Sequence, residues 1–151
     1  MNTGRLFVLG IVTALIVLLL VLAPDNNNQI DDIKPYVQSL ALKDEMELCS
    51  ETELKRDYGI SGAQTDGFLL YETMDKTDPG RILVIKVREQ KDADQFRRML
   101  QKTVRDNISK TNANGTELLK NTKIITKGKF LFVIVSENSR DYIRILRSAI
   151  R

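Results

Sequence analysis

The chain has 151 residues, with 23 basic and 20 acidic side chains and a formal net charge of +3. It contains no histidine, so the commonest general base and the commonest metal ligand are both missing. The single cysteine, Cys49, excludes an intrachain disulfide, and we expect a buried, inert thiol, with pairing to another chain as the alternative. We therefore expect neither a metal site nor a cofactor.

An apolar segment lies at the start of the chain, where residues 6–23 carry no charge. As a helix it would reach about 27 Å, close to the ~30 Å thickness of a bilayer's hydrocarbon core. We predict an uncleaved single-pass anchor over 6–23, after a cytoplasmic stub (1–5) and before a linker (24–29). A cleaved secretory signal is the alternative, but the run is long for one and Pro24 suits the position after a cleavage site poorly. Arg5 before the span and acidic residues after it predict that the rest of the chain lies outside the cytoplasm.

Residues 30–151 are numerous enough for one domain with its own core. Apolar residues at helical spacing predict a helix that begins near Pro35, or two short helices on either side of it. Ser50 and Glu53 match a capping box, which predicts a short helix that ends near Gly59.

Hairpins and helices alternate in the rest of the chain. The predicted elements are strand 67–73, turn 78–80, strand 82–87, helix 92–108, polar loop 111–115, strand 122–126, turn 127–129, strand 130–136 and a helix from Asn138 onward. The order strand–strand–helix thus occurs twice (ββαββα). Two hairpins can pair into one antiparallel sheet, so we predict an α+β domain with the helices packed on one face of that sheet.

Charge is distributed unevenly along the sequence. Residues 25–80 hold 13 acidic and 5 basic side chains, whereas residues 81–151 hold 7 acidic and 17 basic ones. Such a difference predicts electrostatic contact between the halves, between copies or with an anionic surface. Alternatively, the two halves interleave in one fold and the surface charge averages out.

Motifs of catalysis are missing from the sequence. It has no phosphate-binding glycine loop, no metal-ligand spacing and no nucleophile elbow around a serine. Asp75 and Asp78 could form an acid–base pair, but their neighbours predict a solvated turn. Lys86 interrupts an aliphatic run, and a lysine buried there could act as a base. The simpler explanation for a lysine in this run is a side chain that points outward from the strand, or one that extends its amine to solvent. We therefore do not expect an enzyme.

A row of arginines on the terminal helix is the best candidate binding site. Arg140, Arg144, Arg147 and Arg151 are spaced by four, three and four residues, which places them on one side of a helix. Guanidinium groups bind phosphates and carboxylates in bidentate fashion, so this arginine stripe predicts an anionic partner: lipid headgroups, envelope polymers, an acidic protein face or the acidic half of another copy. The alternative is a solvated face whose cations complement the helix dipole.

Three stretches in a fixed order resemble a known family: residues 54–60, residues 82–87 leading into the charged helix, and residues 118–122 followed by 128–136. They are similar to an uncharacterised family of domains of unknown function, found in extracytoplasmic and often lipid-anchored proteins of Gram-positive bacteria. The resemblance covers about residues 51–151 and implies an envelope location but no activity. The chain departs from the family in lacking a lipoprotein cysteine after the apolar run. Residues 111–116 also replace an expected tyrosine–proline segment.

These observations favour a non-catalytic binding or adaptor module, tethered to the bacterial membrane with its domain outside the cytoplasm. Its expected partner is a protein or an anionic envelope component. Nucleic acid is not expected, because aromatic side chains do not interleave with the arginine stripe as a stacking surface requires. The alternatives are an envelope enzyme that uses carboxylates or Lys86, and a structural subunit of a membrane complex. Gly10 and Ala14 would allow close helix packing in such a complex.

Overall fold

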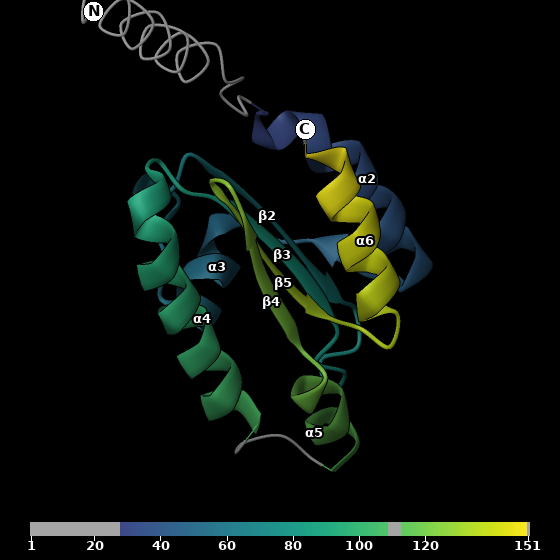
Figure 1. Cartoon of the computed structure of the whole chain (residues 1–151). Coiled ribbons are helices and arrows are strands. Elements are labelled where there is room, and N and C mark those ends of the chain that lie inside the picture. The colour runs from purple at the N-terminus through teal and green to yellow at the C-terminus, as the bar shows by residue number, and fades with distance from the viewer. Residues whose placement is uncertain (1–27, 109–112, 151) are drawn as a thin grey trace, which may run out of the picture.

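The computed structural model describes residues 28–108 and 113–150, and Figure 1 shows a central sheet with helices on both sides. The predicted α+β class is confirmed, as is the predicted pairing of two hairpins into one antiparallel sheet. In chain order the elements are α2 (Ile30–Lys43), β1 (Met46–Leu48), α3 (Glu51–Tyr58), β2 (Gly67–Thr73), β3 (Arg81–Lys86), α4 (Ala93–Ile108), α5 (Ala113–Lys120), β4 (Lys123–Lys127), β5 (Phe130–Val135) and α6 (Ser139–Ala149). Single 3₁₀ turns lie at Gly62–Gln64 and Gln90–Asp92.

The sheet has five strands in the order β1-β2-β3-β5-β4, and every neighbouring pair is antiparallel. The two hairpins, β2–β3 and β4–β5, join through β3 and β5, where Leu83 pairs with Val133. Strand β1 extends the sheet beyond β2 and was not predicted. Its three residues are too few to show the alternation by which a strand is recognised.

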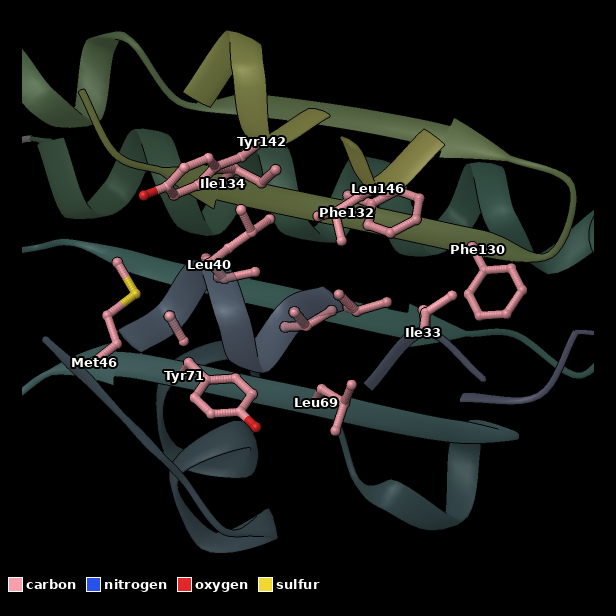
Figure 2. Close-up of a cluster of buried hydrophobic side chains, with 14 of the residues drawn as sticks. Ile33, Leu40, Met46, Leu69, Tyr71, Phe130, Phe132, Ile134, Tyr142 and Leu146 are labelled. Atoms are coloured by element: carbon pink, nitrogen blue, oxygen red, sulfur yellow. The ribbon is translucent and has the colours of Figure 1, made fainter. Parts of the chain in front are cut away.

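Helices cover both faces of the sheet, so the prediction that they pack on one face was wrong. On one face α2 and α6 cover a core that includes Ile33, Phe132 and Leu146 (Figure 2). On the other face α3 and α4 cover a second core that includes Leu70 and Leu83. The reason lies in the central strands, which are apolar on both sides: all six residues of β5 are buried, and so are five of the six in β3. A sheet of this kind needs cover on both faces.

The helix boundaries follow from local chemistry. Helix α2 begins at Ile30, before the predicted start near Pro35, and it continues through Pro35 as one helix instead of two pieces. Helix α3 begins with the predicted capping box, in which the Ser50 side chain accepts from Thr52 N at 3.2 Å and Glu53 accepts from Ser50 N at 2.8 Å. It ends at Gly59, whose φ of 67° is the left-handed conformation that glycine adopts without strain.

Part of the predicted polar loop 111–115 is helical, because α5 begins at Ala113. Residues 111–112 lie outside the described residues. Helix α5 brings Leu119 into the interior, where its side chain is buried. Tertiary packing of this kind outweighs the weak helix propensity of the asparagine and glycine at the start of α5.

Within the sheet, the strands of the two sequence halves lie side by side instead of alternating. Strands β1 and β2 come from the first half, and β3, β5 and β4 come from the second, so the boundary between halves runs between two neighbouring strands. Helices α2 and α3 belong to the first half, whereas α4 and α6 contact β4 and β5 of the second. The charge difference along the sequence is therefore also a difference between the two edges of the sheet, although α2 packs against β3 and α6 of the second half.

The described chain begins and ends at the same end of the sheet (Figure 1). Asn28 Nδ2 donates a hydrogen bond to the carbonyl oxygen of Ala149, at 3.2 Å. Lys127 Nζ lies at the same end and donates to the carbonyl oxygens of Arg147 and Ile150, near the C-terminus of α6. Within residues 28–108 and 113–150 no helix combines the length and the apolarity that a membrane span requires. The predicted anchor, 6–23, lies outside the described residues.

Candidate functional site

A polar cleft lies at the end of the sheet opposite to Asn28 and Ala149. It has a volume of about 910 Å³ and is formed by the β2–β3 turn, α5 and the β5–α6 connection. We call it the distal cleft. Its lining residues are Thr77, Asp78, Pro79, Gly115, Glu117, Leu118, Asn121, Lys123, Ser136, Glu137, Asn138, Ser139, Arg140 and Asp141.

Internal hydrogen bonds shape the β2–β3 turn on one side of this cleft. Asp75 Oδ1 accepts from the backbone N–H and the hydroxyl of Thr77, at 2.8 and 2.7 Å, and the backbone hydrogen bond in particular lowers the pKa of Asp75. Asp78 Oδ1 accepts from Gly80 N at 2.7 Å. A Cβ on Gly80 would lie 2.9 Å from Thr73 Cγ2, so a larger residue there would force the Thr73 side chain to shift. Asp75 and Asp78 are exposed and serve the turn, as predicted.

A partly buried hydrogen-bond network around Asp44 lies next to the cleft. Ser136 Oγ donates to Asp44 Oδ2 at 2.6 Å, and Tyr142 OH donates to Asp44 Oδ1 at 2.7 Å. Ser136 Oγ also accepts from Asn138 N at 3.1 Å. Burial, together with the hydrogen bond to Asp44, raises the pKa of Tyr142 to about 12. The network thus fixes the start of α6 against the end of α2.

Asp44 also lines a smaller hollow of about 230 Å³, which shares Asp78, Leu118 and Ser136 with the distal cleft. Sequence reasoning missed Asp44 and Ser136 because their contact spans 92 positions of the chain. Nothing local to either residue signals that contact.

The chemistry of the distal cleft suits binding. Four carboxylates and two basic side chains line it: Asp78, Glu117, Glu137, Asp141, Lys123 and Arg140. The buried Ser136 hydroxyl donates to a carboxylate and has no imidazole to activate it, since the chain contains no histidine. Over the described residues no three side chains of histidine, cysteine, aspartate or glutamate gather as a metal site.

The arginines of the stripe do not share one set of neighbours in the structure. Arg140, Arg144 and Arg147 are all exposed on α6, but only Arg140 lines the distal cleft. Arg144 pairs with Asp141 at 3.0 Å. Arg147 lies towards the other end of the helix, where its carbonyl oxygen accepts from Lys127. Arg151 lies outside the described residues.

Lys86 lies far from the distal cleft, and the prediction that it points outward or reaches solvent was wrong. Its side chain is only 4% exposed, and Nζ lies 2.9 Å from Asp66 Oδ2. It also donates to Gln29 Oε1 at 2.9 Å. The position near the end of β3 places its amine under the start of α2, so burial is compensated by an ion pair and a hydrogen bond.

A second polar cluster is buried beneath α3. Arg81 Nη1 lies 3.4 Å from Glu72 Oε1 and 3.3 Å from Tyr58 OH, and its guanidinium lies 5.9 Å from the centre of the Tyr58 ring. Burial raises the pKa of Glu72, and the Asp57 carboxyl beside it adds to this, against the opposing charge of Arg81. Cys49 is partly buried, not fully buried as predicted, and this burial, with a contribution from Glu72, raises its pKa to about 11.

The fold and the cleft define a small α+β domain with a polar surface site. The chain belongs to the family described as a domain of unknown function, DUF4358, whose model matches residues 38–136. That range includes Asp44, Asp78 and Ser136, and it ends before the arginine stripe. No curated protein and no solved structure matches the chain.

Proposed function

We propose that this protein is a non-catalytic binding module, tethered to the membrane by residues 6–23, whose distal cleft receives a polar segment of a partner protein. The placement of the cleft carries the proposal. Asn28, which lies in the predicted linker after the anchor, is at one end of the sheet, and the cleft opens at the other. A tethered domain would then present the cleft away from the bilayer, where a partner can reach it.

The lining of the cleft supports a peptide or protein surface as the ligand. Pockets for small molecules are usually apolar and aromatic with a few polar groups. Here most of the lining is polar or charged, and it contains no aromatic side chain. The lining contains four carboxylates and two basic side chains, so the cleft suits a segment with both basic and acidic side chains. Arg140 would bind an acidic group of that segment in bidentate fashion.

The enzyme alternative has less support. Lys86, its candidate base, is engaged with Asp66 and Gln29 at the other end of the sheet from the distal cleft. The carboxylates in the β2–β3 turn accept hydrogen bonds from the turn itself. No observation favours the third alternative, a structural subunit held through the span.

Crosslinking in native membranes tests the proposal. A photoreactive residue at Glu137 or Asn121 should capture a discrete partner, and the same residue at Lys102, an exposed position on α4, should not. Arg140→Glu should abolish capture, whereas the matched change Arg147→Glu should leave it intact, because Arg147 is exposed on α6 outside the lining. Equal loss in both variants would favour the whole stripe over the cleft. Failure to capture any partner from the cleft positions would contradict the proposal.

Location can be tested separately. In a Cys49→Ser background, Lys102→Cys should react with a membrane-impermeant maleimide in intact cells if the domain lies outside the cytoplasm. Protection in intact cells, with labelling only after lysis, would contradict the proposed orientation.

A further inference from the structure

The two edges of the sheet carry opposite charge. Within residues 28–80 there are 12 acidic and 5 basic side chains, whereas residues 81–108 and 113–150 hold 7 acidic and 15 basic ones. Because β1 and β4 are the edge strands and come from different halves, the acidic half ends in one edge and the basic half in the other.

The acidic edge consists of Glu45, Glu47 and Leu48, all of them exposed. Leu48 is 57% exposed on a strand that has a partner on only one side. All four large apolar side chains that stand exposed among the described residues belong to the acidic half: Tyr36, Leu42, Leu48 and Met74. Leu48 therefore gives the acidic edge uncovered apolar surface as well as negative charge.

The basic edge consists of Lys120, at the end of α5, and Lys123, at the start of β4. Lys127 lies further along β4, but its amine is engaged with the carbonyls of α6. Lys120 and Lys123 are therefore the basic groups at this part of the edge.

Leu48 on the acidic edge and Lys123 on the basic edge lie in the same row across the sheet. The register connects Leu48 to Lys123 in one continuous row, through Tyr71, Ile82 and Ile134. Since every neighbouring pair is antiparallel, β1 and β4 run in the same direction. If a second copy is moved along the direction that runs from strand to strand, without rotation, its β4 comes to lie beside β1 of the first copy. Lys123 of the second copy then lies level with Leu48 of the first.

We propose that the acidic edge of one copy binds the basic edge of a second copy, so that copies associate side by side in the membrane in a head-to-tail manner. Lys123 also lines the distal cleft, so the basic edge borders that cleft, whereas the acidic edge does not. Exposed ion pairs are individually weak and screened by salt, so the association depends on the high local concentration that a shared membrane provides. Because the two surfaces differ, the contact is heterologous and can extend beyond a dimer.

Zero-length coupling of carboxylates to amines tests this in the full chain, reconstituted in vesicles of zwitterionic lipid. A mixture of isotopically light and heavy protein distinguishes links between copies from links within one copy. We expect mixed light–heavy peptides that join Glu45 or Glu47 to Lys120 or Lys123, and we expect their yield to fall several-fold in high salt. Links confined to single copies would overturn the proposal, as would links between two acidic-half segments.

Two charge-reversal variants supply the matched control. The first combines Glu45→Lys with Glu47→Lys, and the second combines Lys120→Glu with Lys123→Glu. Each variant alone has two edges of like charge and should lose association. When the two variants are mixed, every contact between unlike copies is complementary, so association should return. Such recovery also shows that both variants are folded. If each variant associates alone as well as the original protein does, the edges do not form the contact. Thermal unfolding shows whether each variant is folded. If both variants unfold cooperatively and their mixture still does not associate, the proposal is wrong.

Discussion

Glu72 and Lys86 are buried ionisable residues on the sheet, and each lies beside an oppositely charged side chain, Arg81 for Glu72 and Asp66 for Lys86. Lys86 meets Gln29 across 57 positions, and Glu72 meets Arg81 across the β2–β3 hairpin. Local sequence predicted the turn that joins β2 to β3, but it could not predict how either charge is compensated. The strand pattern around Lys86 was apolar, and no neighbouring residue indicated which element would cover it.

Glu72 should make the protein less stable as the pH rises, whereas a carboxylate with a lowered pKa makes a protein less stable as the pH falls. Its pKa is raised above the usual value of 4.5 by burial, so its contribution is fully present below pH 4.5 and is lost as the pH rises through the raised pKa. The free energy of unfolding of Glu72→Gln should therefore fall less than that of the original protein between pH 4.5 and 7.5. Urea unfolding at a series of pH values measures this; parallel profiles for the two proteins would contradict it.

Cys49 should react slowly with thiol reagents in the folded protein. A pKa of about 11 in place of 9.0 lowers the thiolate fraction near pH 8 by about a hundredfold. The rate of reaction with a disulfide reagent, compared between native and urea-unfolded protein, measures the difference. Glu72→Gln should speed the native reaction, because Glu72 contributes to the raised pKa. Equal rates in the native and unfolded states would show that the thiol is not protected.

At the scale of single elements, helix α3 shows what local sequence can predict. Its capping box and its terminal glycine are both local signals, and the structure contains both. Strand β1 and helix α5 lack such signals. The first is too short for a pattern, and the second begins with residues that favour loops. Both exist because larger neighbouring elements hold them in place.

Ser50→Ala should destabilise the protein by about 1 kcal/mol, the usual cost of removing a side chain that caps a helix N-terminus. The alanine leaves Thr52 N without its acceptor. Chemical denaturation gives the difference in unfolding free energy. Thr52→Ala, at an exposed position in the first turn of α3, should change the unfolding free energy little. A similar loss in both variants would mean that removal of the cap is not the cause.

Lys127→Met should also destabilise the protein, by about 1 kcal/mol, because it removes a cation from carbonyl oxygens near the C-terminus of α6. Lys129→Met, two residues away beyond the β4–β5 turn, is the matched control and should have a smaller effect. Thermal unfolding of both variants separates the two. An unchanged unfolding temperature in Lys127→Met would exclude a capping role.

For the whole molecule, the three-layer arrangement was the main feature that sequence analysis got wrong. The two hairpins and their pairing were predicted, yet the helices were expected on one face. The strands themselves held the correct signal, since the run from Phe130 to Val135 is continuously apolar instead of alternating. The halves of the sequence could not be placed relative to one another without the strand order.

The central layer should dominate stability. Leu83 on β3 is fully buried, so Leu83→Ala should cost about 2–5 kcal/mol through lost burial and a new cavity. Leu48 lies on the edge strand with 57% of its surface exposed, and Leu48→Ala should change the unfolding free energy by less than about 0.5 kcal/mol. Urea titration of the two variants side by side provides the comparison. Comparable losses would contradict a stability concentrated in the middle of the sheet.

The hydrogen bond between Asn28 and Ala149 has a practical consequence for anyone who labels this protein. A fluorescent protein or affinity tag fused behind α6 would emerge beside the segment that leads to the predicted anchor, and it would crowd the bilayer while leaving the distal cleft open. A label meant to report on the cleft belongs instead on the exposed β2–β3 turn, for example at Lys76.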